Sequence, residues 1–317
     1  MKYRLGIDLG GTNIVAAVVD EKYKIVGKAS CNTAVPRPEE EICDSMAEVA
    51  LKAVAKAKLT MDDIKTVGIG VPGAVNPETG VIEYSANLFF HNWEIVKMMQ
   101  ERLNKPVNIE NDANAAAYGE YLAGAAKGAK NALAITLGTG VGAGIIIDGK
   151  IYSGSNYAGA EMGHMVIVKD GKECACGRKG CWEAYASATG LINLTKEAIV
   201  KERPDCSYML KLCDGDISKV SGVTAFKAAK DGDEIGRQVV STYISYLACG
   251  VINAINIFQP DVLCVGGGIS NEGDNLLEPL RDIVKGERYT KHNDKQTVIC
   301  KCELGNDAGI IGAAFLD

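Results

Sequence analysis

The sequence lacks an excess of positive charge, since its 317 residues carry a formal net charge of −6. Proteins that bind nucleic acid or anionic membranes concentrate lysine and arginine, so we expect neither partner. Met1 leads directly into the apolar run YRLGIDLG, which has no features of a signal peptide. We also identify no charge-free apolar stretch of 18 or more residues that would span a bilayer. The expected location is the cytoplasm.

Two common nucleotide-binding motifs are also missing. There is no G-x4-G-K-[ST] sequence, which excludes a P-loop protein. Residues 68–73, GIGVPG, match the dinucleotide-binding pattern G-x-G-x-x-G, but Pro72 and Gly73 begin a turn where that pattern requires the start of a helix. We therefore interpret this match as coincidental.

Disulfides are not expected either, although the chain has eleven cysteines. In a chain of this size without a signal peptide, cysteines are expected to be thiols or metal ligands. Most of them are scattered, which is typical of small buried hydrophobic residues or incidental thiols. The scattered ones are Cys31, Cys43, Cys206, Cys213, Cys249, Cys264, Cys300 and Cys302.

The remaining cysteines form a cluster in the segment ECACGRKGCWE at 173–183. They are Cys174, Cys176 and Cys181. With His164, ten residues before the first of them, they make a Cys3His set of the kind that holds structural zinc. Gly177 and Gly180 would let the chain wrap tightly around an ion. The spacing is not that of a zinc finger, so a redox or free-thiol cluster stays as the alternative.

The rest of the chain alternates between predicted strands and helices. Residues 3–20 and 132–149 follow the same plan of an apolar run, a Leu-Gly turn and a second apolar run, which suggests two α/β domains that each open with such a hairpin. Helices are expected at 39–58, 113–126, 186–202 and 236–258, a strand and glycine turn at 260–270, and a short helix of small residues at 306–316. This alternation predicts a layered α/β fold without a linker between its halves.

Three glycine-rich turns follow predicted strands: DLGGTN at 8–13, TLGTGVG at 136–142 and VGGGIS at 265–270. Glycine lets backbone N–H groups approach phosphate oxygens because no Cβ stands in the way. Each turn alone fits a tight hairpin equally well. Together they indicate a nucleotide site.

Asp112 follows the strand VNIEN and precedes the alanine-rich helix. One interpretation is a helix N-cap, which would satisfy free N–H groups. The other is a general base that accepts the proton of an attacking hydroxyl group. The residues alone leave both open.

The motifs DLGGTN (8–13), ENDANAAAYGE (110–120), LGTGVGAGI (137–145) and GAEMGH (159–164) resemble those of the ROK family of sugar kinases and sugar-responsive repressors. The resemblance runs from about residue 4 to the DAGIIGAA segment, and CACGRKGCWEAYASATG further resembles the family's bacterial glucokinases. It implies a duplicated actin/hexokinase-like (ribonuclease H-like) α/β fold with ATP held in a cleft between two domains. The expected domains are residues 1–117, joined by a C-terminal helix at 305–317, and residues 118–304, which carry the zinc loop.

The resemblance also implies roles for individual residues. It makes Asp112 the general base and Asp8 the residue that orients Mg²⁺ through water. The sugar ligands would be Asn87, Asn111, Asp112, Glu161, His164 and Glu183, with Trp93 packing in the core nearby. The phosphate contacts of ATP would be Gly10, Gly11, Thr12, Gly138 and Thr139, and the nucleoside would lie near Gly266, Gly267 and Gly268. ROK kinases that bind zinc share the cysteine pattern, so His164, Cys174, Cys176 and Cys181 would hold a structural Zn²⁺ that fixes the loop carrying the sugar ligands.

The function expected from this resemblance is ATP-dependent phosphorylation of a hexose at its 6-hydroxyl, with glucose first. N-acetylmannosamine, N-acetylglucosamine, fructose or allose is the main alternative substrate, and polyphosphate is an open alternative donor. A sugar-sensing repressor is a weaker alternative, because the first hairpin begins too close to Met1 for a preceding DNA-binding segment. Relatives are commonly dimers and sometimes tetramers, so a homodimer is expected.

Overall fold

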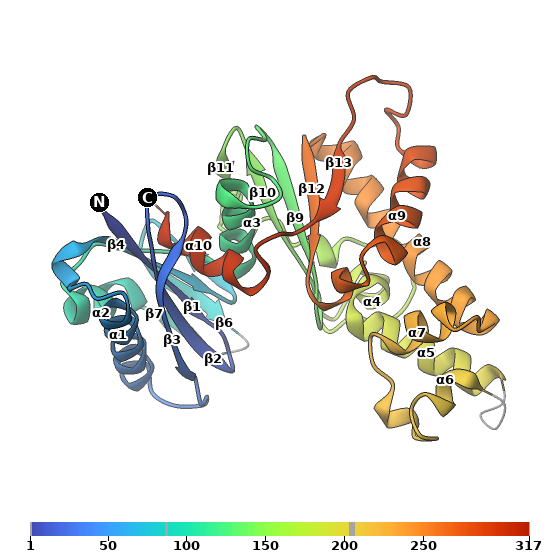
Figure 1. Cartoon of the computed structure of the whole chain (residues 1–317), viewed down its shortest axis with the longest axis horizontal. Helices are drawn as coiled ribbons and strands as arrows, with labels where there is room; N and C mark the ends of the chain where they lie inside the picture. The colour runs from blue at the N-terminus through green and yellow to red at the C-terminus, as the bar shows by residue number, and fades with distance from the viewer. Residues whose placement is uncertain (1, 86–87, 203–206, 317) are drawn as a thin grey trace. The chain divides into compact units, whose positions relative to one another are not determined.

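The protein is described here by a computed structural model of residues 2–85, 88–202 and 207–316. The chain separates into two compact units (Figure 1). The first unit contains Met1–Ala134, Gly144–Ala160 and Glu303–Asp317, and the second contains Ile135–Ala143 and Glu161–Cys302. The predicted domains, 1–117 with 305–317 and 118–304, have other bounds and stay a prediction.

The first unit is built on a sheet with the strand order β3-β2-β1-β4-β8. Its strands are β1 (Tyr3–Leu9), β2 (Asn13–Val19), β3 (Ile25–Asn32), β4 (Ile64–Val71) and β8 (Val107–Asn111). β1 forms antiparallel pairs with β2, and parallel pairs join β1 to β4 and β4 to β8. Parallel strands end at the same edge of a sheet, so the residues that follow β1, β4 and β8 come close together.

Helices pack on this sheet and close its core. They are α1 (Glu39–Lys56), α2 (Ile95–Leu103), α3 (Asp112–Ala123) and α10 (Ala308–Ala314), with the 3₁₀ turns η1 (Met61–Asp63) and η5 (Gly305–Asp307). α1 packs on β2 and β3, and its buried face includes Ile42 and Met46. α10 packs on β1 and β4 (Figure 1). The helices predicted at 39–58, 113–126 and 306–316 are therefore confirmed within a few residues.

The glycines of GIGVPG have a packing role. A Cβ at Gly68 would lie 1.7 Å from the carbonyl oxygen of Ala313 on α10, and a Cβ at its register partner Gly6 would lie 2.0 Å from the carbonyl oxygen of Ile310 on the same helix. β4 is followed by a turn and then by β5 (Ala74–Asn76), which pairs with β6 (Val81–Ser85) and, through it, β7 (Phe90–Trp93). Strand β5, and not a helix, begins directly after Gly73, so the interpretation of this motif as coincidental is confirmed.

The other large sheet has the order β11-β10-β9-β12-β13. Its strands are β9 (Ala132–Leu137), β10 (Val141–Ile147), β11 (Lys150–Ile151), β12 (Val262–Gly266) and β13 (Val298–Lys301). Numbered within each sheet, both orders read third, second, first, fourth, fifth. The duplication inferred from the two Leu-Gly hairpins is thus present in the strand order itself.

Most helices of the second unit surround one long helix, α8 (Glu234–Phe258). They are α4 (Glu183–Ala186), α5 (Ala188–Glu202), α6 (Tyr208–Lys211), α7 (Thr224–Lys230) and α9 (Asp274–Glu287), with η2 (Met162–His164), η3 (Ile217–Lys219) and η4 (Gly268–Glu272). α8 packs against α4, α5, α7 and α9, and Figure 1 shows α8 and α9 side by side. The segment predicted as one helix at 186–202 is therefore preceded by a separate short helix, α4.

The expectation that the chain has no charge-free apolar stretch of 18 or more residues is wrong for α8. Residues 238–258 carry no charge, and the helix is long and apolar enough by composition to cross a membrane, with a mean hydropathy of 1.3. In the most apolar 18-residue stretch of this helix, 56% is buried inside the protein, where the neighbouring helices pack on it. Its apolar character is therefore explained by packing in the core of the second unit.

Candidate functional site

Two acidic residues lie at the carboxyl edge of the parallel strands in the first unit. Asp8 is in β1 and pairs in register with Gly70 of β4, while Asp112 follows β8 directly. A Cβ on Gly70 would lie 3.8 Å from the Cα of Asp112. Because Gly70 has no side chain, nothing from β4 separates the two carboxyl groups.

Burial and mutual repulsion change the protonation of this pair. Burial raises the pKa of Asp8 to about 6, the charge of Asp112 adds to the increase, and Lys28 opposes it. Burial also raises the pKa of Asp112. Two largely desolvated carboxyl groups of this kind form an oxygen-rich site that favours a hard cation or a proton donor.

Asn111, not Asp112, caps helix α3. The Asn111 Oδ1 atom accepts hydrogen bonds from the N–H groups of Ala113 (2.9 Å) and Asn114 (3.2 Å), and its Nδ2 donates to the Gly73 carbonyl (3.0 Å). Among the other residues that the structure describes, Ala113 alone donates to Asp112 Oδ1, through its N–H at 2.9 Å. Asp112 Oδ2 accepts from no other residue in the described part of the chain. The capping interpretation of Asp112 is therefore wrong, and one carboxylate oxygen is left for chemistry.

Glu110 is a neighbouring acid that the sequence analysis did not single out. It is 5% exposed, and its Oε1 accepts from Asn111 N (2.8 Å) and Asn114 Nδ2 (3.0 Å). Burial raises the pKa of this carboxyl group. Glu110 thus fixes the junction between β8 and α3 on which Asp112 sits, and only its place in the END triplet hinted at such a role.

The first glycine turn, Gly10, Gly11 and Thr12, joins β1 to β2. Gly10 N donates to the carbonyl of Asn13 at 2.9 Å. Thr33, fully buried, donates its hydroxyl to Gly10 O (2.6 Å) and its N–H to Thr12 O (2.8 Å). Carbonyl groups of the turn are therefore occupied, which is the arrangement an anion requires. Thr33 lies in none of the recognised motifs, so its role could not be predicted from sequence.

The second glycine turn, residues 138–141, lies in the second unit between β9 and β10. Gly138 N donates to Gly140 O at 3.0 Å, and a Cβ on Gly138 would meet no atom within 4 Å. Glu183, at the start of α4, accepts from Val141 N through its Oε2 at 2.9 Å. Two predicted groups of residues, the phosphate turn and the sugar ligand Glu183, are thus in direct contact.

The third glycine turn, Gly266, Gly267 and Gly268, packs against the second. Gly267 has a φ of 82°, and a Cβ there would lie 2.4 Å from the carbonyl oxygen of Leu137. Only glycine fits this position. Gly268 has open space around its missing Cβ. The glycine turns predicted in the second unit therefore lie side by side.

Glu161 and His164 flank the short helix η2. Glu161 is exposed and precedes η2, while His164 ends it. Between them, a Cβ on Gly163 would lie 2.3 Å from the carbonyl oxygen of Val141. The segment with these two predicted sugar ligands therefore lies against the second glycine turn.

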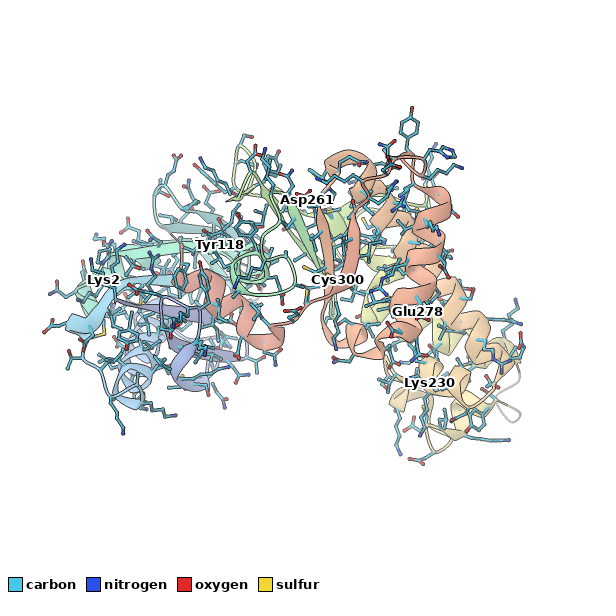
Figure 2. All side chains as sticks on the ribbon, turned by 45° about the horizontal axis from the view of Figure 1, so that its top comes forward. Lys2, Tyr118, Lys230, Asp261, Glu278 and Cys300 are labelled. Carbon is cyan, nitrogen blue, oxygen red and sulfur yellow. The ribbon has the colours of Figure 1, made fainter. Side chains whose placement is uncertain are left out.

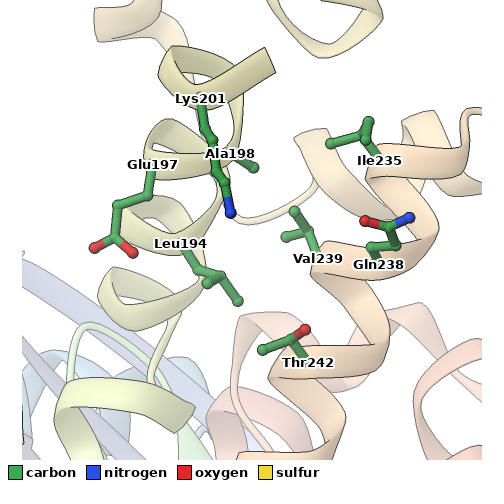
Figure 3. A pocket seen from close by; sticks show the side chains of 8 residues that line it. All are labelled: Leu194, Glu197, Ala198, Lys201, Ile235, Gln238, Val239 and Thr242. Atoms are coloured by element: carbon green, nitrogen blue, oxygen red, sulfur yellow. The ribbon is translucent and has the colours of Figure 1, made fainter.

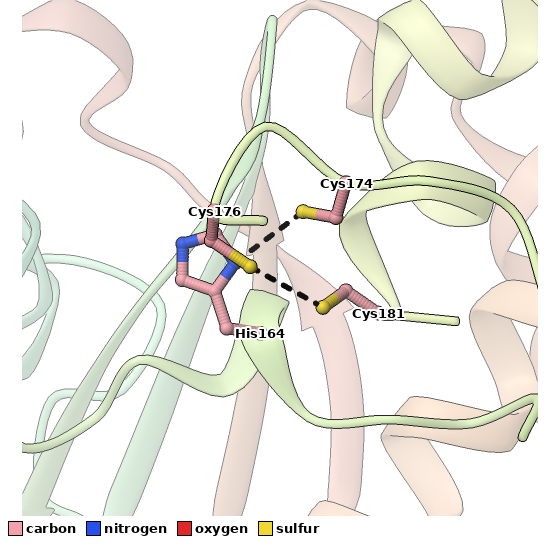
Figure 4. A group of neighbouring side chains, drawn as sticks. All are labelled: His164, Cys174, Cys176 and Cys181. Carbon is pink, nitrogen blue, oxygen red and sulfur yellow. Dashed lines mark hydrogen bonds between the residues drawn. The ribbon is translucent and has the colours of Figure 1, made fainter. Parts of the chain in front are cut away.

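The predicted metal ligands come together in the second unit (Figure 4). One ligand atom from each of His164, Cys174, Cys176 and Cys181 lies within 4.8 Å of all the others. Cys174 Sγ is 3.7 Å from His164 Nδ1, and Cys176 Sγ is 3.6 Å from Cys181 Sγ. A tetrahedral Zn²⁺ with Zn–S bonds of ~2.3 Å separates its ligands by about 3.7 Å, so these residues fit the ion.

The backbone around this Cys/His cluster fits the same role. Gly177 and Gly180 both have positive φ, 85° and 80°, and a Cβ on Gly180 would lie 1.7 Å from the carbonyl oxygen of Val168. The expectation that these glycines let the loop wrap tightly is confirmed.

The remaining predicted residues fall outside the site or outside the described residues. Asn87 and Cys206 lie outside the described residues. Trp93 is fully buried, with its Nε1 3.3 Å from Met98 Sδ, which confirms its place in the core. No disulfide joins the cysteines in the described ranges, and Cys300 of β13 (Figure 2) lies opposite Cys264 of β12.

A groove of about 470 Å³ between α5 and α8 holds none of the predicted residues (Figure 3). Its lining is Leu194, Glu197, Ala198, Lys201, Ile235, Gln238, Val239 and Thr242. It offers no phosphate turn and no cluster of acids, so the candidate site lies elsewhere.

The comparisons with known proteins agree with these features. The model of the ROK family matches residues 4–317. A glucokinase of Streptomyces coelicolor is 36% identical and covers 100% of this chain and 98% of its own length. A glucokinase of Thermotoga maritima is 35% identical, and the match covers 98% of this chain and 96% of that protein. The crystal structure of a ROK family glucokinase from Streptomyces griseus in complex with glucose and AMPPNP is 33% identical, covers 98% of both chains and has a TM-score of 0.80.

The near full-length likeness extends to the architecture. The duplicated sheets, the glycine turns and the Cys/His cluster all lie within the matched range, and the fold is of the actin/hexokinase-like class. This chain belongs to the ROK family.

Proposed function

We propose that this protein is an ATP-dependent hexose kinase that phosphorylates the 6-hydroxyl of glucose. The single observation that carries the proposal is the released carboxylate of Asp112, which Asn111 frees from helix capping at the edge where β1, β4 and β8 end. The similarity to glucokinases, one of them crystallised with glucose and AMPPNP, supports the substrate and the donor.

In the proposed reaction Asp112 is the general base. Its Oδ2 accepts the proton of the sugar 6-hydroxyl as that oxygen forms a bond to the γ-phosphorus of ATP, and the bond to the ADP oxygen breaks. Burial raises the pKa of Asp112, which makes the ionised form a stronger proton acceptor. Because the transition state of phosphoryl transfer is loose, the position of Asp112 matters as much as its basicity. Asn111 and Glu110 fix that position through their hydrogen bonds.

Asp8 is the proposed holder of Mg²⁺, which would neutralise charge on the phosphates of ATP. The residues fit this ion, because two carboxyl groups lie close together and desolvated in a site lined by glycine. The glycine turn that begins at Gly10 would bind phosphate oxygens beside it. In the second unit, Gly138 and Thr139 would bind phosphate and Gly266, Gly267 and Gly268 would adjoin the nucleoside.

The proposed sugar ligands in the second unit are Glu161, His164 and Glu183, and those in the first are Asn87, Asn111 and Asp112. Asn111 keeps one N–H for a sugar hydroxyl after its capping bonds are made. His164 directs Nδ1 to the Cys/His cluster, which leaves Nε2 for the sugar.

We further propose that the Cys/His cluster holds a structural zinc ion. Four protein ligands leave no open position for water, so the ion would brace the loop from His164 to Glu183 without activating a nucleophile. We also propose a cytoplasmic homodimer, with a tetramer as an alternative, and no nucleic-acid or membrane partner.

An assay of ADP release over a panel of sugars tests the proposal. Glucose should give the highest kcat/KM, and N-acetylmannosamine, N-acetylglucosamine, fructose and allose should give lower values. Polyphosphate is tested as the donor in parallel. Asp112→Asn should lower kcat at least a hundredfold while glucose binding persists, because a general base contributes about 10²–10⁴ in rate. Unchanged turnover would remove Asp112 from the mechanism, and no turnover with any sugar would refute kinase activity.

A further inference from the structure

We infer that Glu183 and Thr189 are positioning residues for the second glycine turn, residues 138–141, so that nucleotide binding depends on the segment that follows the last cysteine of the cluster. This inference rests on the proposed kinase function. It gives Glu183 a second task besides the sugar contact that the motif implies.

Glu183 occupies the inside of the turn. Its Oε2 accepts from Val141 N at 2.9 Å and would lie 2.2 Å from a Cβ on Gly140. The carboxylate therefore fills the space that any other residue at position 140 would need for its side chain. The backbone at this point is set by Glu183 as well as by the strands on either side.

Two more bonds from the same segment hold the turn. Ala188 N donates to Gly138 O at 2.8 Å, and the Thr189 hydroxyl donates to Thr139 O at 2.8 Å. Both carbonyl oxygens would repel a phosphate, and these hydrogen bonds turn them toward donors within the protein. In the described part of the chain the N–H groups of Thr139 and Gly140 donate to no acceptor, which is the pattern of a backbone anion site.

The segment is itself firmly held on α8. The Trp182 indole N–H donates to Tyr246 O at 3.0 Å, and Tyr243 donates its hydroxyl to Ala186 O at 2.7 Å. Trp182 and Tyr243 are both fully buried. Glu183, between these two anchors, can therefore impose a fixed geometry on the turn.

The test measures binding of AMPPNP with Mg²⁺ by calorimetry in the absence of sugar. Glu183→Ala should weaken binding about fivefold, which corresponds to about 1 kcal/mol, the usual contribution of one hydrogen bond. Glu183→Gln keeps an acceptor for Val141 N and should bind AMPPNP like the wild type. A residue that contacts only the sugar would change AMPPNP binding in neither variant.

Thr189 provides a second pair of variants away from the cluster. Thr189→Val should weaken AMPPNP binding about as much, and Thr189→Ser, which keeps the hydroxyl, should restore it. This pair decides the matter if Glu183→Ala does not fold. If both Glu183→Ala and Thr189→Val bind AMPPNP with wild-type affinity, the inference is overturned and the proposed function is not affected. A wild-type chain that binds no AMPPNP overturns the proposed function and the inference with it.

Discussion

The carboxyl group of Asp8 is buried at a cost in stability that depends on pH. Its pKa is about 6 in the folded protein, against ~3.9 for an unperturbed aspartate. Between these values the folded state holds the proton and the unfolded state does not, so the free energy of unfolding falls as pH rises from about 4 to about 6. Above that range the full cost, at most about 3 kcal/mol, is present.

We therefore predict that Asp8→Asn stabilises the fold at neutral pH. The gain in the free energy of unfolding should approach 3 kcal/mol at pH 7.5 and vanish near pH 4, because the neutral amide resembles the protonated acid. Urea denaturation at the two pH values measures it, and activity should fall because the ligand for Mg²⁺ is lost. Asp62→Asn, at an exposed position on η1, is the control. An equal effect of Asp8→Asn at both pH values would contradict the role of ionisation.

The roles of residues could be predicted from the sequence where a motif identifies one residue. They were harder to predict where adjacent residues could both fill the same role. The ENDAN segment identified Asp112 but left capping and catalysis unresolved, because Asn and Asp are both good N-caps. The choice depends on which side chain turns back over Ala113, and Asn111 also has a partner in Gly73, far away in sequence. Thr33 and Glu110 act through tertiary contacts of this kind, which spacing does not encode.

At the scale of elements, the loop of the Cys/His cluster is held by local hydrogen bonds, such as those from Gly180 N to Lys172 O (2.7 Å) and from Cys174 N to Arg178 O (2.9 Å). It contains isolated bridges, Val166 with Cys181 and Glu173 with Lys179, instead of a full strand pair. Its anchor is Trp182, which follows the last cysteine and donates its indole N–H to Tyr246 O of α8. Because these contacts are short-range, metal ligation is expected to add to the order of this loop.

Removal of zinc by a chelator should abolish sugar binding and leave most secondary structure intact. Hydrogen exchange should rise in residues 161–181 and stay unchanged in α8, and metal analysis should show one zinc per chain before treatment. Cys176→Ser should lose the metal in the same way, while Cys249→Ser, a half-buried thiol on α8, should keep it. A metal-free, fully reduced sample with normal sugar affinity would refute the bracing role. Absence of zinc from the native protein would favour the redox alternative.

The identities of most elements followed from periodicity, because helices such as α1 show one apolar face and strands such as β1 are buried runs. α8 was harder, since it is apolar around most of its circumference and composition does not distinguish a core helix from a membrane span. The start of α4 was also missed. It is a single turn held by Trp182 and the second glycine turn, and no propensity marks so short a helix.

At the scale of the whole molecule, the duplication was visible in two Leu-Gly hairpins, and the sheets repeat it strand by strand. The bounds of the compact units were not visible, because the chain passes from one unit to the other within β9, within β10, after Ala160 and again after Cys302. Sequence patterns predict the secondary structure of each segment, but they do not show on which of the two units the C-terminal segment packs. Residues 303–317 return to the first unit, where α10 packs on β1 and β4.

Glu120 ties this returning segment to the first unit. It is 1% exposed and lies near the end of α3. Its Oε1 accepts from Leu304 N (2.8 Å), and its Oε2 accepts from Glu303 N (3.1 Å) and Ala125 N (2.9 Å). One side chain thus satisfies three backbone N–H groups at the point where the chain turns toward α10.

Glu120→Ala should therefore lower the free energy of unfolding by about 2–3 kcal/mol, because three part-buried N–H groups lose their acceptor and each such hydrogen bond contributes about 1 kcal/mol. Glu120→Gln keeps one carbonyl oxygen and should lose less. Glu48→Ala, which removes an exposed ion pair with Lys52 on α1, should cost under about 1 kcal/mol. Thermal unfolding measures the three variants, and hydrogen exchange locates the effect. Faster exchange should be greatest in residues 303–314, since α10 loses the anchor that precedes it. Wild-type exchange there would mean that α10 docks through its contacts with β1 and β4 alone.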